Sequence, residues 1–362
     1  MSQPWSRAAT TTELAVLHHP DQRCSWVVLL AVDLAQPITV TSMTERLQAL
    51  HEQHEVIGAR LAGERWVRGG APTVAITAAD PLDGLDAPFH LATEAPLRVA
   101  LAADGSRLGI AAHHAALDGR GVLSIAAALC EWPPTVLRAP APTPTPSRDD
   151  RWRSRRALVR RALAPAQRVG APGTFGAIDQ RGAEARAART FSPRSPDATA
   201  HLAAAGAAAL GLRRTGITIG IAGQPGIGNF ATYRRVDVGR GDDVVDHVRA
   251  ALGSTIEPPE LRRPRRVPAA LLPLVDRLSD TIVVSNLGRV LAPGAVAIEF
   301  YPVARGRSAV AFGAAGIEGG ASTLTIRAAH LSPVDAEALL EDVVMRCARA
   351  AGVGTAPDAW PQ

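Results

Sequence analysis

The chain has 362 residues, of which 47% are hydrophobic, and a formal net charge of +5. This length and apolar content exclude a disordered or fibrous chain and provide enough core for two ordinary domains or one large one. No apolar run approaches the roughly 18 to 20 residues of a membrane span, and the first residues lack the apolar segment of a signal peptide. The sequence therefore predicts a cytoplasmic protein with no membrane partner.

The basic residues, the aromatic residues and the cysteines limit which partners and which kinds of site the protein can have. All 39 basic residues are arginine, and the sequence pI of about 10 favours acidic partners. The chain has only 6 Trp, 2 Tyr and 6 Phe, too few for the stacking platforms of single-strand nucleic-acid binders, so no nucleic-acid partner is expected. Cys24, Cys130 and Cys347 are far apart and form no CxxC pair, which argues against a disulfide framework and a metal site.

Apolar periodicity in the first half predicts strands mixed with helices. Either Thr41 or Ser42 is expected to cap the first helix, and two apolar runs that flank Asp104-Gly105 predict a hairpin. The predicted elements are strands over 25–34, 59–69 and 72–77, a hairpin over 96–112, and helices over 41–56 and 119–132.

A Pro-rich segment over 133–147 predicts an extended, semi-rigid domain boundary. The closing helix is marked by Ser332 as its N-cap and Pro333 at its first position. The predicted subdomains are 1–147 and 176–362, with a basic linker helix in 148–175. The second half is expected to contain a basic helix over 148–168, a strand and an Ala-rich helix over 186–211, strands over 215–223 and 231–239, a helix over 241–253, strands over 280–288, 295–303, 308–319 and 322–331, and the closing helix over 332–352.

Chemistry-bearing residues gather where the hairpin ends, in "IAAHHAALDGRGVLS" over 110–124. A neutral imidazole of His113 or His114 can take a proton from a hydroxyl, amine or thiol near neutral pH. Asp118 can hold the loop closed or orient a histidine ring, and Gly119 permits a backbone conformation that other residues resist. A structural turn with a satisfied histidine is the alternative interpretation, because an isolated HxxxD pattern is common.

The stretch "HHAALDG" resembles the HHxxxDG motif of condensation domains from nonribosomal peptide synthetases, in a superfamily that includes chloramphenicol and polyketide-associated acyltransferases. Nearly the whole chain shares weaker likeness with this superfamily. The plant-type DFGWG signature is absent, which argues against the plant branch. The similar segments are 87–119, 217–238, 285–290 and 324–343.

The resemblance implies a mixed α/β (α+β) fold of two chloramphenicol-acetyltransferase-like subdomains that form a V with an active-site tunnel between them. It implies direct transfer of an acyl or aminoacyl group from a thioester to an amine or hydroxyl. His114 would be the general base or positioning residue, His113 and Asp118 would be structural, and Gly119 would keep the loop close to the thioester. No cofactor would be bound. A phosphopantetheine-linked thioester, on an acyl or peptidyl carrier protein or on CoA, would be the co-substrate.

The sequence departs from the family at one position. Relatives carry an arginine in the second-half strand pair that pairs with the motif aspartate, and Gln224 stands there in this chain. Asp118 is expected to pair with another arginine, of which Arg289 is one candidate, or with Gln224 itself; otherwise the bridge is absent. The departure and the short chain keep two alternatives open, namely a non-catalytic module that binds a carrier protein and a cyclisation step on a thioester-bound substrate.

Two further groups of residues are candidate contacts. Ser285 and Asn286 end a buried strand and could donate hydrogen bonds to a tetrahedral oxyanion, although a satisfied turn explains them equally well. The basic helix offers arginines that suit a phosphopantetheine or CoA phosphate or an acidic carrier protein, with a solvated helix face as the alternative. These arginines are Arg153, Arg156 and Arg160.

Overall fold

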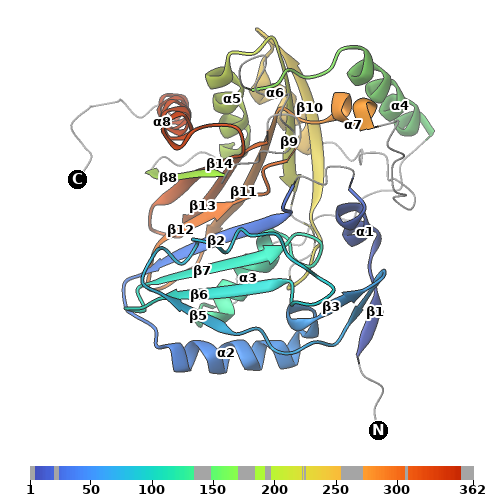
Figure 1. Cartoon of the computed structure of the whole chain (residues 1–362). Helices are drawn as coiled ribbons and strands as arrows, with labels where there is room; N and C mark the ends of the chain where they lie inside the picture. The colour runs from blue at the N-terminus through green and yellow to red at the C-terminus, as the bar shows by residue number, and fades with distance from the viewer. Residues whose placement is uncertain are drawn as a thin grey trace.

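The computed structural model describes residues 5–19, 24–133, 148–169, 184–191, 197–221, 223, 226–253, 272–305 and 309–351. These residues fold into two large mixed β-sheets and one small antiparallel sheet, with helices packed on the large sheets (Figure 1). The predicted mixed α/β class is confirmed. The Pro-rich boundary segment lies outside the described residues except for Pro133, and the predicted subdomain limits stay predictions.

The first large sheet has the strand order β12-β2-β7-β6-β5. At its centre, the predicted strand β2 is buried on both faces from Val27 to Val32, which explains its continuous apolar run. Because side chains alternate along a strand, Val28 and Leu30 join the core under the helices, while Val27 and Leu29 join a second cluster on the opposite face. The strands are β2 (Val27–Leu34), β5 (Val74–Thr77), β6 (Leu97–Ala102), β7 (Arg107–His113) and β12 (Ala295–Tyr301).

Two helices cover one face of this sheet, α2 (Val40–Gln53) and α3 (Gly119–Leu129). The N-cap of α2 is Thr39, whose hydroxyl accepts a hydrogen bond from the backbone N–H of Ser42 at 3.2 Å. The predicted caps Thr41 and Ser42 are therefore wrong, because both residues already lie in the first helical turn.

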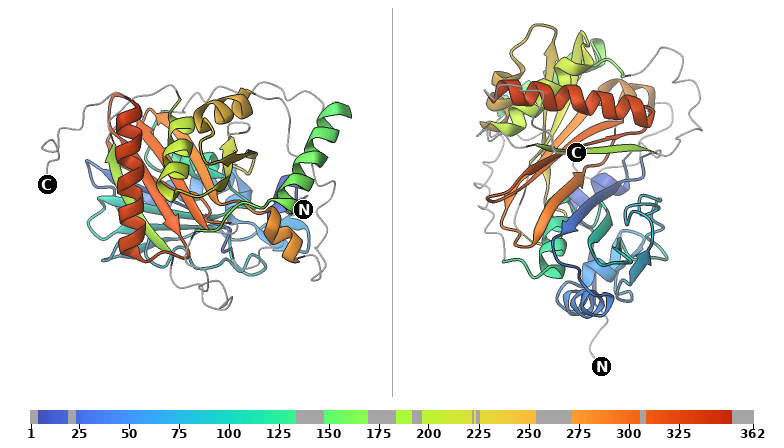
Figure 2. Two further views of the ribbon diagram at one scale, coloured as in Figure 1. Left: turned by 90° about the horizontal axis from the view of Figure 1, so that it is seen from above. Right: turned by 90° about the vertical axis from the view of Figure 1, so that its left-hand side faces the viewer.

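The second large sheet has the strand order β10-β9-β11-β13-β14-β8. Figure 2 shows α5, α6 and α8 on one face of this sheet, with the first sheet on the other side. The helix α8 begins as predicted, since the Ser332 hydroxyl accepts a hydrogen bond from the backbone N–H of Asp335 at 3.1 Å. The elements are β8 (Ala185–Phe191), α5 (Ala198–Leu210), β9 (Arg214–Ile221), β10 (Thr232–Gly239), α6 (Val244–Gly253), β11 (Ile282–Val290), β13 (Val310–Ile317), β14 (Ser322–Ala328) and α8 (Pro333–Ala350).

Other short elements complete the described fold. The helix α1 is not predicted from the sequence; a capping box of Thr10 and Glu13 begins it, and the buried Glu13 carboxylate pairs with Arg7 at 2.6 Å. The predicted basic helix is α4, which ends at Leu163 and not at 168. The bounds are β1 (Ser6–Ala8), α1 (Thr11–Leu17), η1 (Glu55–Gly58), β3 (Arg60–Ala62), β4 (Arg65–Val67), α4 (Arg148–Leu163) and the unpredicted α7 (Leu272–Leu278).

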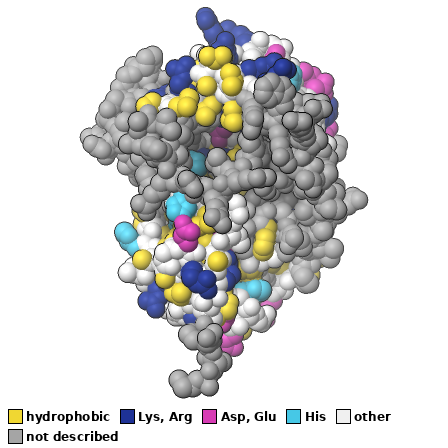
Figure 3. All heavy atoms as spheres, turned by 90° about the vertical axis from the view of Figure 1, so that its right-hand side faces the viewer, with side chains coloured by type: hydrophobic (Ala, Val, Ile, Leu, Met, Phe, Trp, Pro, Cys, Tyr) yellow, Lys and Arg dark blue, Asp and Glu magenta, His cyan; other side chains and the backbone are white. Residues whose placement is uncertain are grey.

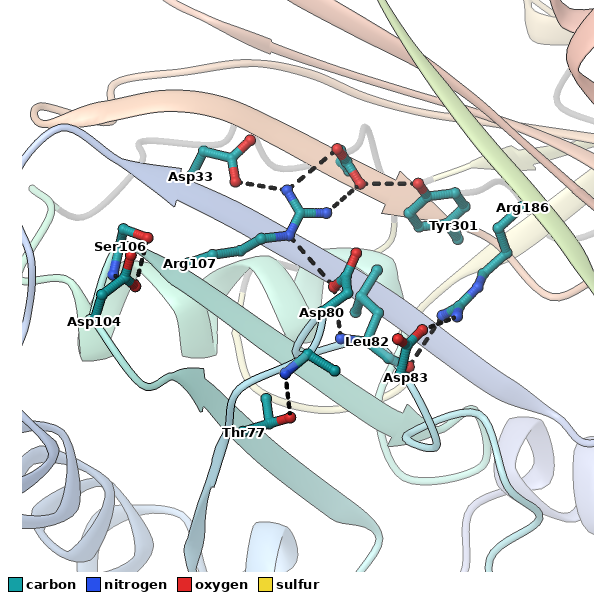
Figure 4. Close-up of polar contacts among 12 residues, drawn as sticks. Asp33, Thr77, Asp80, Leu82, Asp83, Asp104, Ser106, Arg107, Arg186 and Tyr301 are labelled. Carbon is teal, nitrogen blue, oxygen red and sulfur yellow. Dashed lines mark hydrogen bonds and ion pairs between the residues drawn. The ribbon is translucent and has the colours of Figure 1, made fainter.

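The strand β12 belongs to the first sheet although it comes from the second half of the chain. It pairs antiparallel with β2, so that Phe300 lies opposite Leu30. Figure 4 shows the polar network beside this pairing, in which the Arg107 guanidinium donates to the Asp33 carboxylate at 2.5 Å. The same guanidinium donates to Glu299 of β12 at 2.8 Å. A division of the chain at a single boundary therefore does not describe the membership of the two sheets.

Candidate active site

The motif loop connects β7 to α3 and runs from His113 to Gly119. The backbone N–H of His113 donates to the Pro96 carbonyl at 2.9 Å, just before β6. The backbone N–H of His114 donates to the Trp26 carbonyl at 2.7 Å, just before β2. The first sheet therefore holds both histidines at the end of its strands, where the apolar pattern places them.

His113 faces the protein interior. Its side chain is buried, its Nδ1 accepts a hydrogen bond from the backbone N–H of Ala115 at 3.1 Å, and its ring meets Phe89 edge-on with centroids 6.1 Å apart. Burial lowers the pKa of His113 to about 4, and the neighbouring His114 adds to this shift. The ring is therefore neutral at pH 7 and acts as an acceptor inside the loop.

His114 is half-buried and has a different hydrogen-bond pattern. Its Nδ1 lies 3.2 Å from the carbonyl oxygen of Leu117. A carbonyl only accepts, so Nδ1 carries the proton and donates, which leaves a lone pair on Nε2. Burial lowers the pKa of His114 below 6.5; the Leu117 carbonyl and Asp118 oppose the shift, and Arg305 adds to it. Among the described residues Nε2 has no hydrogen-bond partner, so the neutral ring has a basic nitrogen available at pH 7.

Trp26 forms one wall beside this ring. The two rings are stacked with centroids 6.3 Å apart and an interplanar angle of 19°. Trp26 has φ of 53°, a left-handed conformation that costs energy for a bulky side chain and is often kept at functional sites. No local pattern in the sequence indicates this tryptophan, because its place beside His114 depends on its backbone conformation.

Asp118 is buried, and within the described residues its carboxylate accepts hydrogen bonds only from backbone N–H groups. Its Oδ1 accepts a hydrogen bond from Gly121 at 2.8 Å and so caps α3. Its Oδ2 accepts a hydrogen bond from the N–H of Phe230 at 2.8 Å. One carboxylate thus ties the motif loop to the segment that precedes β10 in the second half.

The segment 226–230 makes two more contacts with the motif loop. The side-chain N–H of Asn229 donates to the His114 carbonyl at 2.6 Å, and the Gly228 carbonyl accepts from the backbone N–H of Asp118 at 3.0 Å. Gly121 has no room for a side chain here, since a Cβ on it would lie 2.7 Å from the Gly228 oxygen. Asn229 and Phe230 are not predicted from the sequence, because contacts across more than a hundred residues leave no local pattern.

Arg289 does not pair with Asp118. Its guanidinium donates to the carbonyl oxygens of Ile317 at 2.5 Å and Gly320 at 2.6 Å, at the far end of the second sheet. The suggested replacement partner is therefore wrong; the N–H of Phe230 and the cap on α3 satisfy the carboxylate instead. Gln224, the other suggested partner, lies outside the described residues.

Gly119 is required by packing and not by its backbone angle. The φ angle of Gly119 is not positive, so the prediction of a backbone conformation that other residues resist is wrong. A Cβ at Gly119 would lie 2.6 Å from Cζ of Phe300 and 3.1 Å from Cδ2 of Leu287. The glycine thus lets the motif loop pack directly on β12 and β11, and its proximity to a thioester stays a prediction.

Ser285 and Asn286 point to opposite faces of β11. The amide N–H of Asn286 donates to the Thr199 hydroxyl of α5 at 3.1 Å, so this side chain lies on the helix-covered face and is not directed toward His114. Ser285 lies on the other face, where its Oγ would be 3.0 Å from a Cβ on Gly220. A role of Ser285 in binding an oxyanion stays a prediction.

A charged group that the sequence reasoning misses lies near His114. Arg305, between β12 and β13, has its guanidinium carbon 5.3 Å from the ring centroid of Tyr233 and pairs with Asp280 at 3.5 Å. Asp280 is buried and also pairs with Arg235 at 2.7 Å. The positive charge of Arg305 explains part of the lowered pKa of His114.

The basic helix α4 lies on the right-hand side of the molecule in Figure 1, and Figure 3 views the molecule from that side. Exposed hydrophobic side chains flanked by arginines gather near the top of this face. Val159 and Leu163 are exposed by 58% and 78%, and Arg156 and Arg160 are exposed beside them. The side chain of Arg153 lies outside the described residues.

The described part of the chain holds no group of three or more His, Cys, Asp or Glu side chains placed to bind a metal ion. Across the same residues, no helix is both long and apolar enough to cross a membrane.

No protein-family model and no curated relative matches the chain. Solved structures do match over nearly its whole length. The first condensation domain of the calcium-dependent antibiotic synthetase, in complex with a substrate analogue, has a TM-score of 0.66 at 15% identity over 97% of this chain and 98% of that one. The EpoB cyclization-docking bidomain from Sorangium cellulosum has a TM-score of 0.64 at 12% identity over 96% and 85%.

A third structure, the starter condensation domain of rhizomide synthetase in complex with C8-CoA and Leu-SNAC, has a TM-score of 0.61 at 13% identity over 97% of this chain and 95% of that one. These likenesses establish that the chain has a condensation-domain-like fold. They confirm the condensation-domain-like, mixed α/β fold that the HHxxxDG resemblance implies. The V arrangement with its tunnel and the roles of single residues stay predictions.

Proposed function

We propose that the protein is a condensation-like acyltransferase. It transfers an acyl or aminoacyl group from a carrier-protein or CoA thioester to an amine or hydroxyl acceptor, in natural-product biosynthesis. The observation that carries this proposal is the bond from Nδ1 of His114 to the Leu117 carbonyl, which leaves Nε2 free as a base. The condensation-domain-like fold supports the thioester donor.

In the proposed reaction, the acceptor nitrogen or oxygen attacks the thioester carbonyl while Nε2 of His114 takes its proton. The tetrahedral intermediate then collapses, the carbon–sulfur bond breaks, and the thiolate leaves with that proton. No acyl-enzyme is needed. Burial raises the pKa of Cys130 and Cys347 to about 12, so neither thiol is a ready nucleophile.

The test incubates the protein with loaded carrier protein or acyl-CoA and candidate acceptors, and follows the products by intact mass spectrometry. We expect His114→Ala to reduce turnover by about 10²- to 10⁴-fold, the usual contribution of a positioned acid or base. His247→Ala is the matched control, because the exposed His247 also places Nδ1 on a backbone carbonyl, at 2.7 Å. Turnover that is unchanged in His114→Ala contradicts the assignment.

The same experiment separates the alternatives. Carrier binding without turnover, unaffected by His114→Ala, would instead favour a non-catalytic carrier-binding module. The likeness to a cyclization domain keeps a cyclisation step as the second candidate, and loss of water from the thioester-bound substrate would identify it by mass.

We further propose that α4 receives the phosphopantetheine phosphate or the acidic carrier protein, through Arg153, Arg156 and Arg160. The exposed apolar residues Val159 and Leu163, on the same helix as Arg156 and Arg160, support a macromolecular contact. Charge reversal in Arg156→Glu/Arg160→Glu should raise KM for a carrier-bound donor at least tenfold and leave KM for an N-acetylcysteamine thioester unchanged. Equal effects on both donors would contradict this docking site.

A further inference from the structure

A cavity of about 440 Å³ lies on the helix-covered face of the second sheet, between α5, α8 and the ends of β11 and β13. Its size is typical of pockets that bind small molecules. Asn286 and Ala314 line it from the sheet, and Thr199 lines it from α5. It shares no residue with the motif loop, which meets β11 from the opposite face through Leu287.

The space results from a bulge in β11 and from small side chains. The register of β11 against β13 shifts between Asn286 and Arg289, and Gly288 within the shift has φ of 78°. A bulge redirects the side chains of a strand, and here Arg289 lines the cavity. Ala198 and Gly316 are too small to fill the remaining volume.

Two features of its lining make the cavity attractive to an anion. Arg289 has no carboxylate partner among the described residues; its guanidinium contacts the carbonyls of Ile317 and Gly320 and, at 3.4 Å, the Ser322 hydroxyl. The first turn of α5 also lines the cavity, and the carboxylate of its N-cap Asp197 pairs with Arg249 at 2.7 Å and makes no capping hydrogen bond to the helix. A helix N-terminus carries partial positive charge.

Apart from His201, the rest of the wall is apolar and includes Phe191, Leu202, Leu324 and Cys347. A mostly apolar lining with a single arginine suits a ligand with a hydrocarbon body and a single negative head group. We propose that this cavity binds an amphipathic carboxylate of the medium-chain fatty-acid type, with Arg289 holding the carboxylate. The site is separate from His114, and the proposal does not depend on the acyltransferase function.

The test titrates decanoate into the full chain by calorimetry, with decanol as the uncharged comparison. We expect one decanoate to bind per chain, and decanol to bind at least tenfold more weakly. Ala314→Leu fills the cavity and should abolish binding, while Arg289→Gln should weaken it at least tenfold. Arg240→Gln is the matched control, because the exposed Arg240 also donates to a backbone carbonyl, that of Gly211 at 3.0 Å.

Absence of decanoate binding, equal binding to Ala314→Leu, or equal affinity for decanol would overturn the proposal. If Arg289→Gln does not fold, the Ala314→Leu variant and the comparison with decanol still test whether decanoate binds in the cavity. His114→Ala should bind decanoate with unchanged affinity, and a tenfold loss in this variant would overturn the separation of the two sites. The decanoate titration therefore tests the cavity independently of the acyl-transfer assay, and a failure of acyl transfer does not change its outcome.

Discussion

The carboxylate of Asp118 and the backbone N–H of Phe230 form a 2.8 Å hydrogen bond that joins the motif loop to the second half of the chain. The other carboxylate oxygen caps α3 through Gly121. Asn229, next to Phe230, donates to the His114 carbonyl at 2.6 Å. The loop that carries the candidate base is thus held from both halves by backbone and amide groups, and no arginine takes part in its described contacts.

Substitutions of Asp118 should separate its two contacts. In Asp118→Asn, one oxygen still caps α3, but the amide N–H₂ faces the N–H of Phe230 and leaves buried donors without acceptors, a loss of about 1 to 3 kcal/mol. Asp118→Ala also removes the cap and should cost about 1 kcal/mol more. Urea denaturation measures both, with the exposed Asp335→Asn as control. Equal midpoints for Asp118→Ala and the parent chain would refute the double contact.

The buried His113 predicts a pH dependence of stability. The pKa of His113 is about 4 in the folded chain and 6.5 in its unperturbed state. Between pH 4 and pH 6.5 the ring is therefore protonated in the unfolded chain and neutral in the folded chain. Stability from this residue is fully present above pH 6.5 and is lost as the pH falls toward 4. By pH 5 the loss should reach about 2 kcal/mol, at about 1.4 kcal/mol per pH step.

Denaturation of the parent chain and of His113→Asn at pH 7.5 and 5.0 checks this expectation. The Asn side chain offers an acceptor to Ala115 but does not titrate. The drop in stability should be about 2 kcal/mol smaller in the variant; parallel drops would show that the ring is not held neutral.

Gly119→Ala should destabilise the protein by about 1 to 3 kcal/mol, because the added methyl group would overlap the Phe300 ring. The backbone itself can accept alanine, so a smaller residue at 300 should relieve the clash. In a double-mutant cycle with Phe300→Leu, the combined loss should be less than the sum of the single losses. If the two losses of stability add exactly, the strain in Gly119→Ala does not come from the Phe300 ring.

Arg305→Gln should raise the pKa of His114, since it removes a positive charge that disfavours the imidazolium form. Release of Asp280 from its pair with Arg305 acts in the same direction. NMR titration of the His114 ring measures the shift, and Arg240→Gln serves as the exposed control. A lower pKa of His114 in Arg305→Gln would show that Arg305 acts on the ring through its solvation and not its charge.

Local patterns in the sequence predict most of the elements. The apolar run of β2 and the Ser332 cap of α8 are confirmed because each depends on neighbours in the chain. Strand and helix order also places the motif histidines correctly, at the end of β7. The N-cap Thr39 is missed, because several hydroxyl residues lie together and only the backbone angle selects one.

The contacts between residues far apart in the chain are the part of the site that local sequence patterns do not predict. Asn229 and Phe230 contact the motif loop from the other half, and Arg305 acts on His114 through its charge. Asn286 is turned toward α5 by the strand's alternation and bulge. Each depends on which strands pair across the chain. The partner of Asp118 illustrates this, because the sequence suggests a side chain and the fold supplies a backbone N–H.

The place of β12 in the first sheet has a consequence during synthesis on the ribosome. Until residues 295–301 emerge, β2 is an edge strand with the run Val27 to Val32 open on one side, and exposed apolar edges recruit other strands. The nascent first half should therefore need a chaperone, or else aggregate, for most of the time that translation takes. Residues 1–147 produced alone should be insoluble, and adding a peptide of residues 295–301 should improve their recovery.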